Sequence, residues 1–279
     1  MTARTYSFEF FPPKTPEGEV KLRGVRTRLA ALEPDYFSVT FGAGGATREG
    51  TWSTVQEIHK AGLPVAPHIS CVGSGRASIG KLLTAYREAG IRRLVALRGD
   101  APSGTGVGGG ELAFASELVE FVRAQSGDWF HIDVAAYPEY HPQARSPDED
   151  LEHFVRKVRA GANSAITQYF YNADAYFRFC DEARARGCAV PIVPGVMPIT
   201  NFAQLTRFSD ACGAEIPRWI RNKLASYGDD RESIRAFGLD VVSGLCERLL
   251  AQGAPGLHIF TMNLADASLE IWRRLGLPR

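Results

Sequence analysis

The amino-acid sequence predicts an α/β protein that folds as one (β/α)8 barrel, a TIM barrel, over residues 1–279. The first observation is that short, β-rich apolar runs alternate with longer amphipathic stretches, which indicates parallel strands joined by helical crossovers. The second is that eight such runs occur with no Pro/Ser-rich linker between them. Barrels of about 250 residues form one domain, whereas an open doubly wound sheet usually has fewer strands.

The predicted strands are short runs rich in β-branched and aromatic residues. They are Tyr6–Phe10, Tyr36–Thr40, Pro64–His68, Arg93–Arg98, Ile132–Ala136, Ala165–Tyr169, Ile192–Val196 and Leu257–Thr261. The connection after the seventh run is long, from about Met197 to Pro255. It is predicted to hold the helices Phe202–Cys212 and Ser233–Ala251, with Pro217–Tyr227 as a candidate third. A barrel accepts an insertion of this kind in a connection.

The stretches between the other strands have the apolar spacing of amphipathic helices. The predicted helices are Glu19–Leu32, Thr51–Ala61, Ile79–Ala89, Leu112–Ala124, Asp148–Ala160 and Ala173–Arg186. Four of them end just before a glycine, namely Gly62, Gly90, Gly161 and Gly187. Glycine is common there because it adopts the left-handed backbone conformation that closes a helix.

Composition excludes several classes of function. The chain has 32 basic and 31 acidic residues, and this balance does not suggest a nucleic-acid or membrane surface. The first residues lack the apolar stretch of a signal peptide, and no run is long enough to span a membrane. The five cysteines form no CxxC pair, so we expect neither a disulfide framework nor a zinc site. A reduced cytoplasm is the expected location.

Polar residues follow the predicted strands where a structural position is usually small or apolar. They are Glu9, Thr40, His68, Arg98, Asp100, Tyr137, His141 and Gln168. Barrel active sites lie at the carboxyl ends of the strands, so we expect these side chains to converge. No lysine for a Schiff base, no HxH pair and no GxSxG elbow occurs among them. The remaining acids, arginine, amide and aromatics suit a cofactor that carries the redox chemistry itself.

The run Gly104–Gly109 fits the pattern GxGxxG, which in other proteins marks a dinucleotide-binding turn. That turn must follow the strand directly, but six residues, RGDAPS, intervene here. We therefore interpret the run as a loop over the barrel mouth.

Several motifs along nearly the whole chain resemble those of one family. The segment Ser7–Lys14, SFEFFPPK, resembles the opening motif of methylenetetrahydrofolate reductases. Further matching segments follow in the family's order: Phe37–Ala43, Pro67–His68, Ala96–Asp100, Ala135–Pro142, Lys157–Phe170, Pro194–Phe202 and His258–Asn263. The resemblance implies a (β/α)8 barrel that binds FAD non-covalently without a Rossmann domain. It also implies reduction of 5,10-methylenetetrahydrofolate to 5-methyltetrahydrofolate by NADH or NADPH.

In this family, hydride passes first to flavin N5 and then to the folate, and both substrates use the same flavin face in turn. By position, Glu9 resembles the family's general acid, which protonates the departing N10, with a pKa expected to be raised to about 6–7. Asp100 resembles the aspartate near the flavin and the pterin, where its charge favours the folate iminium cation. Gln168 and Gln204 resemble substrate-amide contacts, and Phe208 the aromatic ring that stacks on each substrate.

The positions that match FAD contacts are Thr40, Phe41, Ala43, His68, Arg98, Gly99, Asp100, Phe114, Ala115, Tyr137, His141, Ala144, Asp150, His153 and Lys157. We expect Lys157 and His141 to face the pyrophosphate. Three positions depart from the family pattern. His153 replaces an expected Asn, and Phe114 replaces an expected Tyr. Leu264 stands where some bacterial members have a folate-contacting Arg, so that contact is left out of the prediction.

Two other functions fit these residues less well. Another flavin or folate barrel, such as a methyltransferase-like or lyase-like protein, is one alternative, and a methyltransferase needs no flavin. A non-catalytic folate- or flavin-binding module is the second, but a binding module needs no acid at Glu9. We expect a homo-oligomer from the resemblance. Because the chain ends at Arg279, we expect no C-terminal regulatory domain and no inhibition by adenosylmethionine. The sequence does not distinguish NADH from NADPH.

Overall fold

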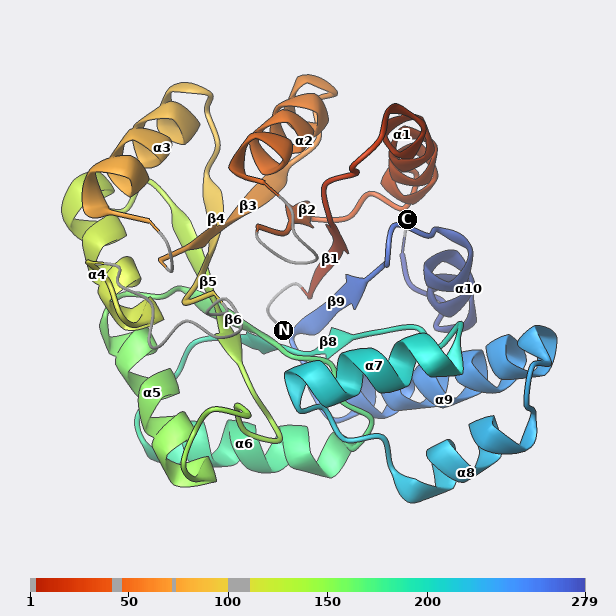
Figure 1. Cartoon of the computed structure of the whole chain (residues 1–279). Helices are drawn as coiled ribbons and strands as arrows, with labels where there is room; N and C mark the ends of the chain where they lie inside the picture. Colours follow the sequence, from red (N-terminus) through yellow and green to blue (C-terminus); the bar gives the residue numbers. More distant parts are fainter. Residues whose placement is uncertain (1–3, 42–46, 72–73, 100–110, 279) are drawn as a thin grey trace.

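A computed structural model describes residues 4–41, 47–71, 74–99 and 111–278. Its parallel strands form one sheet with the order β7-β6-β5-β4-β3-β2-β1-β9-β8, surrounded by helices (Figure 1). The strands are β1 Thr5–Phe10, β2 Tyr36–Val39, β3 Val65–Ser70, β4 Arg93–Leu97, β5 His131–Ala136, β6 Ser164–Thr167, β7 Ile192–Val193, β8 Gly195–Val196 and β9 Gly256–Phe260. The predicted barrel is confirmed.

The seventh strand is broken, and the prediction of one continuous strand over Ile192–Val196 is wrong in this detail. β7 pairs with β6 and β8 pairs with β9, while Pro194 lies between them. Proline has no N–H to donate to a ladder, but its carbonyl oxygen still accepts a hydrogen bond from His258 N at 3.0 Å. The two short strands therefore close the barrel around the proline.

The helices between the strands begin within three residues of the predicted positions. They are α1 Pro16–Ala30, α2 Arg48–Lys60, α3 Arg76–Glu88, α4 Ala115–Ser126, α5 Pro147–Arg159 and α6 Ala173–Ala185. Side chains of Thr15, Thr47, Ser146 and Asn172 accept hydrogen bonds from N–H groups in the first turns of their helices. The four expected glycines follow their helices with positive φ, confirming those helix ends.

The long seventh connection holds α7 Phe202–Cys212, α8 Arg218–Ser226 and α9 Arg231–Ala251. All three expected helices are therefore present. A final helix, α10 Asp266–Arg274, follows β9 and was not predicted. Its N-cap residue is Ala265, which makes no side-chain cap, so the start of α10 carries no capping signal.

Two apolar clusters lie on opposite faces of the strands. The larger one packs between strands and helices and contains Phe37, Ala96 and Ala165. The smaller one consists of the neighbouring residues Tyr36, Ala66, Val95 and Ile166, with Leu97 against it. Successive side chains of a strand point to opposite faces, so the smaller cluster lies inside the barrel. The interior therefore contains few apolar residues.

Polar side chains fill much of the remaining interior. Arg93, at the start of β4, makes two hydrogen bonds to the fully buried Asp133, at 2.6 and 3.1 Å. Burial raises the pKa of Asp133, but hydrogen bonds from His131 and Arg93 outweigh burial and hold that pKa well below its usual range. The Arg93 guanidinium lies 4.0 Å from the centre of the Tyr36 ring. The buried ion pair of Arg93 and Asp133, whose charges balance each other, thus fills the amino-terminal end of the barrel interior.

Within the described ranges, no helix is long and apolar enough to cross a membrane.

We predict that Gly195→Ala destabilises the protein, because a Cβ at Gly195 would overlap the Thr167 carbonyl oxygen and lie 2.6 Å from the Phe260 ring. The overlap involves backbone that forms the barrel closure, so the free energy of unfolding should fall by about 2 kcal/mol or more. Chemical denaturation measures this change. Gly244→Ala is the matched control, since nothing lies within 4 Å of its added Cβ on helix α9. It should raise stability by up to about 1 kcal/mol. Equal stability of the two variants would contradict this account of the closure.

Candidate active site

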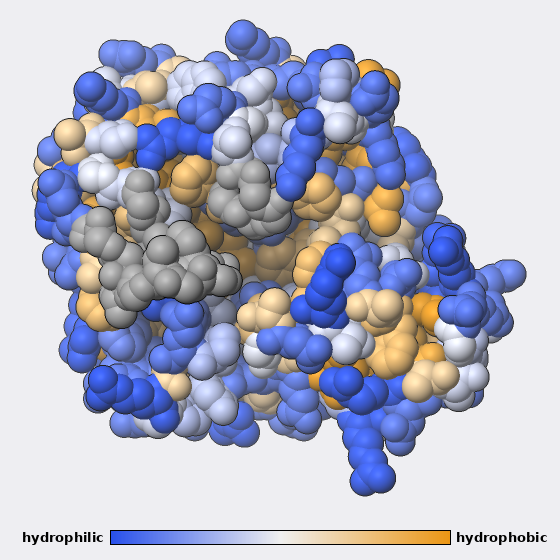
Figure 2. Space-filling view, in the orientation of Figure 1, coloured by the Kyte–Doolittle hydropathy of each residue, from blue (hydrophilic) through white to orange (hydrophobic). Residues whose placement is uncertain are grey.

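The carboxylate of Glu9 lies at the carboxyl end of β1, and three side chains from other strands face it. Its Oε2 is 3.2 Å from His258 Nε2, 3.4 Å from His68 Nε2 and 3.5 Å from Ser38 Oγ. The neighbouring Phe8 and Phe10 belong to the outer apolar cluster, so Glu9 points into the barrel. Figure 2 shows that this face of the molecule is hollowed near its centre. The first strand thus delivers an acid to the barrel mouth.

His258 is held on both ring nitrogens. Its Nδ1 lies 2.7 Å from Ser7 Oγ, while its Nε2 faces Glu9. Ser7 and Glu9 are two residues apart on β1 and therefore lie on the same face of that strand. The pairing of β1 with β9 places Ser7 opposite His258. Ser7, His258 and Glu9 form one hydrogen-bonded chain.

The pKa expected for Glu9 was in the wrong direction. Burial raises the pKa of Glu9, but the imidazoles of His68 and His258 and the Ser38 hydroxyl outweigh burial and hold that pKa below its usual value. Burial lowers the pKa of His68, so its ring is neutral at neutral pH and acts on Glu9 as a dipole.

Two buried polar atoms at the mouth make no hydrogen bond to the described residues. They are Thr40 Oγ1 and His68 Nε2, the latter despite its 3.4 Å distance from Glu9 Oε2. Thr40 directly follows β2, whereas His68 lies two residues before the end of β3. A buried polar atom without a partner costs free energy unless a ligand or water supplies one. Both positions are predicted FAD contacts.

Two cations come together on the opposite side of the mouth. Lys157, in α5, is buried, and its Nζ donates a hydrogen bond to Ala135 O at 2.6 Å. Burial and the nearby charge of Arg98 lower the pKa of Lys157 to about 8, against the attraction of Asp150. Arg98 itself donates hydrogen bonds to Gly99 O and to Gln143 Oε1. Two cations that repel each other in a partly buried place fit an anionic ligand.

Most of the other predicted FAD positions follow β5 or lie in and beside α4 and α5. Phe114 and His153 stack on each other, with ring centres 5.2 Å apart and planes at 19°. Two of the three departures from the family pattern thus form one aromatic pair. Asp150 Oδ2 accepts a hydrogen bond from His141 N, and the His141 ring packs edge-on against Tyr137 at 4.7 Å. The remaining described positions are Phe41 after β2, Ala115 at the start of α4, and Ala144 before α5.

The predicted substrate residues come from β6 and α7. Gln168 directly follows β6, and its Oε1 accepts a hydrogen bond from Tyr169 N at 3.0 Å. Gln204 and Phe208 are half-buried on α7, one turn apart. The Tyr169 hydroxyl lies 3.0 Å from Ser209 Oγ, next to Phe208. These contacts join the two elements that carry the predicted substrate residues.

Some expectations fall on residues outside the described ranges. Ala43 and Asp100 are among them, as is the run Gly104–Gly109. Among the described residues, no group of three or more His, Cys, Asp or Glu side chains could hold a metal ion. Leu264 is partly exposed in the loop after β9.

Sequence reasoning missed Ser7, Ser38 and His258, which all face Glu9 or its partner. The signal for His258 was a single polar residue within the apolar strand GLHIF. Ser7 and Glu9 alternate with aromatic residues in the same way. An inward-pointing polar residue in a barrel strand is expected to serve the mouth or the interior ion pair, since the outward face must be apolar.

The arrangement can therefore hold or release a proton at Glu9 Oε2 and can bind an anion beside Arg98 and Lys157. The family model described as Methylenetetrahydrofolate reductase matches residues 2–276. The chain is 39% identical to the 5,10-methylenetetrahydrofolate reductases of Pectobacterium carotovorum and of Escherichia coli K12. Both alignments cover 97% of this chain and 90% of the relative.

A plant relative and a solved structure are also similar. The chain is 37% identical to a probable methylenetetrahydrofolate reductase (NADH) of Oryza sativa, over 98% of this chain and 48% of that protein. The solved structure is an uncharacterized Clostridium thermocellum protein that binds two copies of 5-methyl-5,6,7,8-tetrahydrofolic acid. It superposes with a TM-score of 0.69 at 16% identity, covering 98% of this chain and 95% of that one, which supports the fold. This chain belongs to the methylenetetrahydrofolate reductase family.

Proposed function

We propose that this protein reduces 5,10-methylenetetrahydrofolate to 5-methyltetrahydrofolate, with non-covalently bound FAD as hydride carrier and NADH or NADPH as donor. Membership of the family supports the overall reaction. The observation that carries the mechanism is the Glu9 carboxylate at the barrel mouth, 3.2 Å from a buried histidine. Reduction of the folate needs a proton at N10, and no metal is required to supply it.

The described residues fit FAD at three places. Arg98 and Lys157 offer positive charge for the pyrophosphate. Thr40 Oγ1 and His68 Nε2, which make no hydrogen bond within the described ranges, offer polar atoms, and the stacked Phe114 and His153 offer an aromatic surface. When bound, FAD supplies the hydride transfer, while the protein supplies binding and orientation. The other matched positions, Ala43 and Asp100 included, belong to the same proposal.

The chain Ser7–His258–Glu9 can support both protonation states of the acid. When Glu9 is ionised, His258 Nε2–H donates to Oε2 and the Ser7 hydroxyl donates to Nδ1. When Glu9 carries the proton, its Oε2–H can donate to Nε2, and Nδ1–H then donates to Ser7 Oγ. A serine hydroxyl both donates and accepts, so neither state leaves a buried atom unpaired. Because the imidazole carries one N–H in both states, the proton that restores Glu9 after turnover comes from solvent.

Glu9 must become protonated before it can act as an acid, although its surroundings lower its pKa in the ligand-free protein. Ligands that cover the mouth exclude water, and removing water disfavours the charged carboxylate. We therefore propose that a ligand covering the barrel mouth raises the pKa of Glu9 toward neutral pH. This places the proton on Oε2 only when a substrate is there to receive it.

The substrate contacts complete the proposal. Gln168 and Gln204 would bind amide or pterin groups, and Phe208 would stack on nicotinamide and folate in turn. Asp100 would favour the iminium cation that accepts the hydride. Successive use of one flavin face gives ping-pong kinetics. A homo-oligomer and a cytoplasmic location stay predictions from the sequence.

We predict that FAD binds more weakly as pH rises through the pKa of Lys157, which is about 8. The ammonium is charged below that pH and neutral above it, and only the charged form attracts a pyrophosphate. The dissociation constant of FAD should rise by about tenfold between about pH 7 and pH 9. Quenching of flavin fluorescence during titration of the flavin-free protein measures it.

Lys157→Met is the control, because methionine fills much of the same space without charge. This variant should bind FAD weakly at neutral pH and with a flatter pH dependence. The same steep dependence in both proteins would remove Lys157 from the FAD site. A wild-type protein that stays colourless after incubation with FAD would refute the proposed cofactor.

We predict that Glu9→Gln separates the two half-reactions. Reduction of the flavin by NADH needs no proton from Glu9 and should persist within about tenfold. Reduction of methylenetetrahydrofolate should fall by about 100-fold or more, because Gln cannot give a proton to N10. Gln keeps the size of the side chain, so folate binding should survive. Stopped-flow absorbance of the flavin measures each half-reaction.

Glu17→Gln, in the first turn of α1, is the control and should leave both half-reactions unchanged. A parallel loss of both half-reactions in Glu9→Gln would mean that Glu9 holds the flavin or the fold instead of acting as the acid.

A further inference from the structure

Tyr169 is a buried residue to which sequence reasoning gave no role. It directly follows Gln168 at the end of β6 and is 5% exposed. Its ring packs edge-on against Phe260, the last residue of β9, at 6.4 Å, and against Tyr171 at 6.0 Å. The ring thus lies between the strand ends, where its orientation is fixed by aromatic neighbours.

The hydroxyl of Tyr169 reaches the helix that carries two predicted substrate residues. It lies 3.0 Å from Ser209 Oγ, and this contact is buried and joins residues 40 positions apart. Leu205 and Ser209 are the buried residues of α7, one turn apart on its inner face. Burial raises the pKa of Tyr169, so the phenol stays protonated. Ser209 is therefore one polar contact through which the inner face of α7 meets this part of the mouth.

The backbone of Tyr169 orients the side chain of Gln168. Tyr169 N donates to Gln168 Oε1 at 3.0 Å, which engages the carbonyl oxygen of the carboxamide. The amide then presents its NH2 group, which donates hydrogen bonds. A ligand that meets Gln168 is thus expected to offer an acceptor, such as a ring carbonyl or a ring nitrogen of a pterin.

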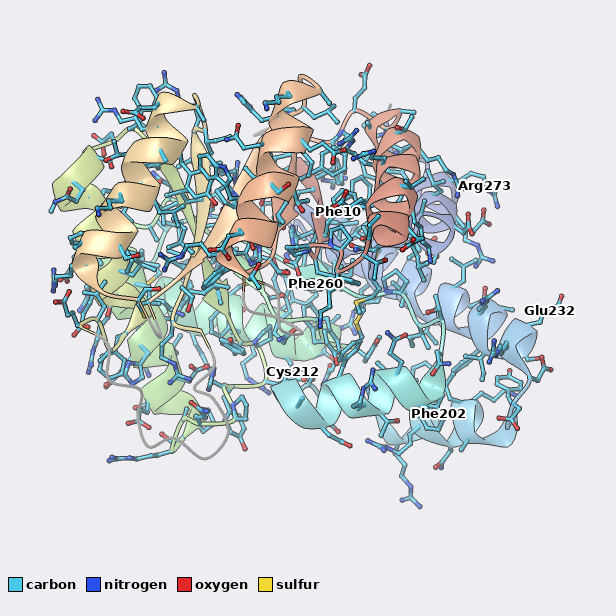
Figure 3. The ribbon with its side chains drawn as sticks, turned by 45° about the horizontal axis from the view of Figure 1, so that its top comes forward. Phe10, Phe202, Cys212, Glu232, Phe260 and Arg273 are labelled. Carbon is cyan, nitrogen blue, oxygen red and sulfur yellow. The ribbon has the colours of Figure 1, made fainter. Side chains whose placement is uncertain are left out.

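A second contact holds the carboxyl-terminal end of α7. Glu215 N, just beyond the helix, donates to Glu139 Oε2 at 2.8 Å. Gly213, which ends α7 with a positive φ, packs against Pro142. Figure 3 labels the two ends of α7, Phe202 and Cys212, with the helix running across the front of the molecule. The Tyr169–Ser209 contact lies near the Cys212 end and fixes the turn that carries Phe208.

We propose that Tyr169 is a positioning residue that joins the two halves of the substrate subsite, Gln168 on β6 and Phe208 with Gln204 on α7. This inference rests on the proposed function, which assigns those three residues to substrates. Tyr169 does not touch the reacting atoms. Its hydroxyl sets the distance of α7 from the strand ends, and its N–H sets the donor orientation of Gln168. Loss of the Tyr169 hydroxyl should weaken substrate binding more than it slows the chemical step.

The test replaces the hydroxyl alone. In the FAD-loaded enzyme, Tyr169→Phe should raise the KM for methylenetetrahydrofolate by about five- to tenfold while kcat changes by less than about twofold. Ser209→Ala should reproduce the effect. The double variant should be no worse than either single one, because both remove the same contact. Tyr176→Phe is the matched control, since its buried hydroxyl bonds Ile192 O, away from α7.

Amide hydrogen exchange gives a readout independent of activity. Exchange in α7 should become faster in Tyr169→Phe than in Tyr176→Phe at equal global stability. If exchange in α7 is faster in Tyr169→Phe but the wild-type protein does not reduce methylenetetrahydrofolate, the proposed function is refuted. The role of Tyr169 in holding α7 then still stands. An unchanged KM together with unchanged exchange in α7 would overturn the inference. So would additive effects in the double variant.

Discussion

The parallel pairing of the first strand with the last is the constraint on which the site depends. β1 and β9 are about 250 positions apart in the chain, yet their register places Ser7 opposite His258 and Glu9 opposite Phe260. That register brings the Glu9 carboxylate within 3.2 Å of the imidazole. Closure requires the split seventh strand, where Pro194 interrupts the ladder and Gly195 permits close approach of Thr167. Shifting β1 by one residue would turn Glu9 toward the helices.

Burying polar groups inside a barrel costs free energy unless these groups are paired. At the amino-terminal end, Asp133 is neutralised by Arg93, so the charge there is balanced inside the fold. At the carboxyl end, His68 Nε2 and Thr40 Oγ1 make no hydrogen bond to any residue that the structure describes, and the charge of Arg98 acts on the buried Lys157. Two of the buried polar atoms without a partner among the described residues thus lie where a ligand is expected to bind.

Periodicity together with the family resemblance predicted the barrel, and turn residues around each apolar run located its strands. It missed α10, whose start at Ala265 has no capping side chain, and the break at Pro194, which depends on ladder pairing. Barrel active sites lie at the carboxyl ends of strands, and this rule indicated Glu9 and Arg98, the neighbour of Lys157. The family resemblance supplied their roles. Neither could give the direction of the Glu9 pKa, which depends on His258 and His68 from distant strands. Contacts through Tyr169 likewise depend on where α7 docks.

Glu9, held by His258, is proposed to give a proton to the folate and to take no part in flavin reduction. The most direct measurement is the pH dependence of a single turnover in which reduced enzyme is mixed anaerobically with methylenetetrahydrofolate. The account predicts that this rate falls with rising pH through one ionisation, and that the ionisation is absent from reduction of the flavin by NADH. A folate step that is independent of pH, or one that quickens as pH rises, would contradict the account.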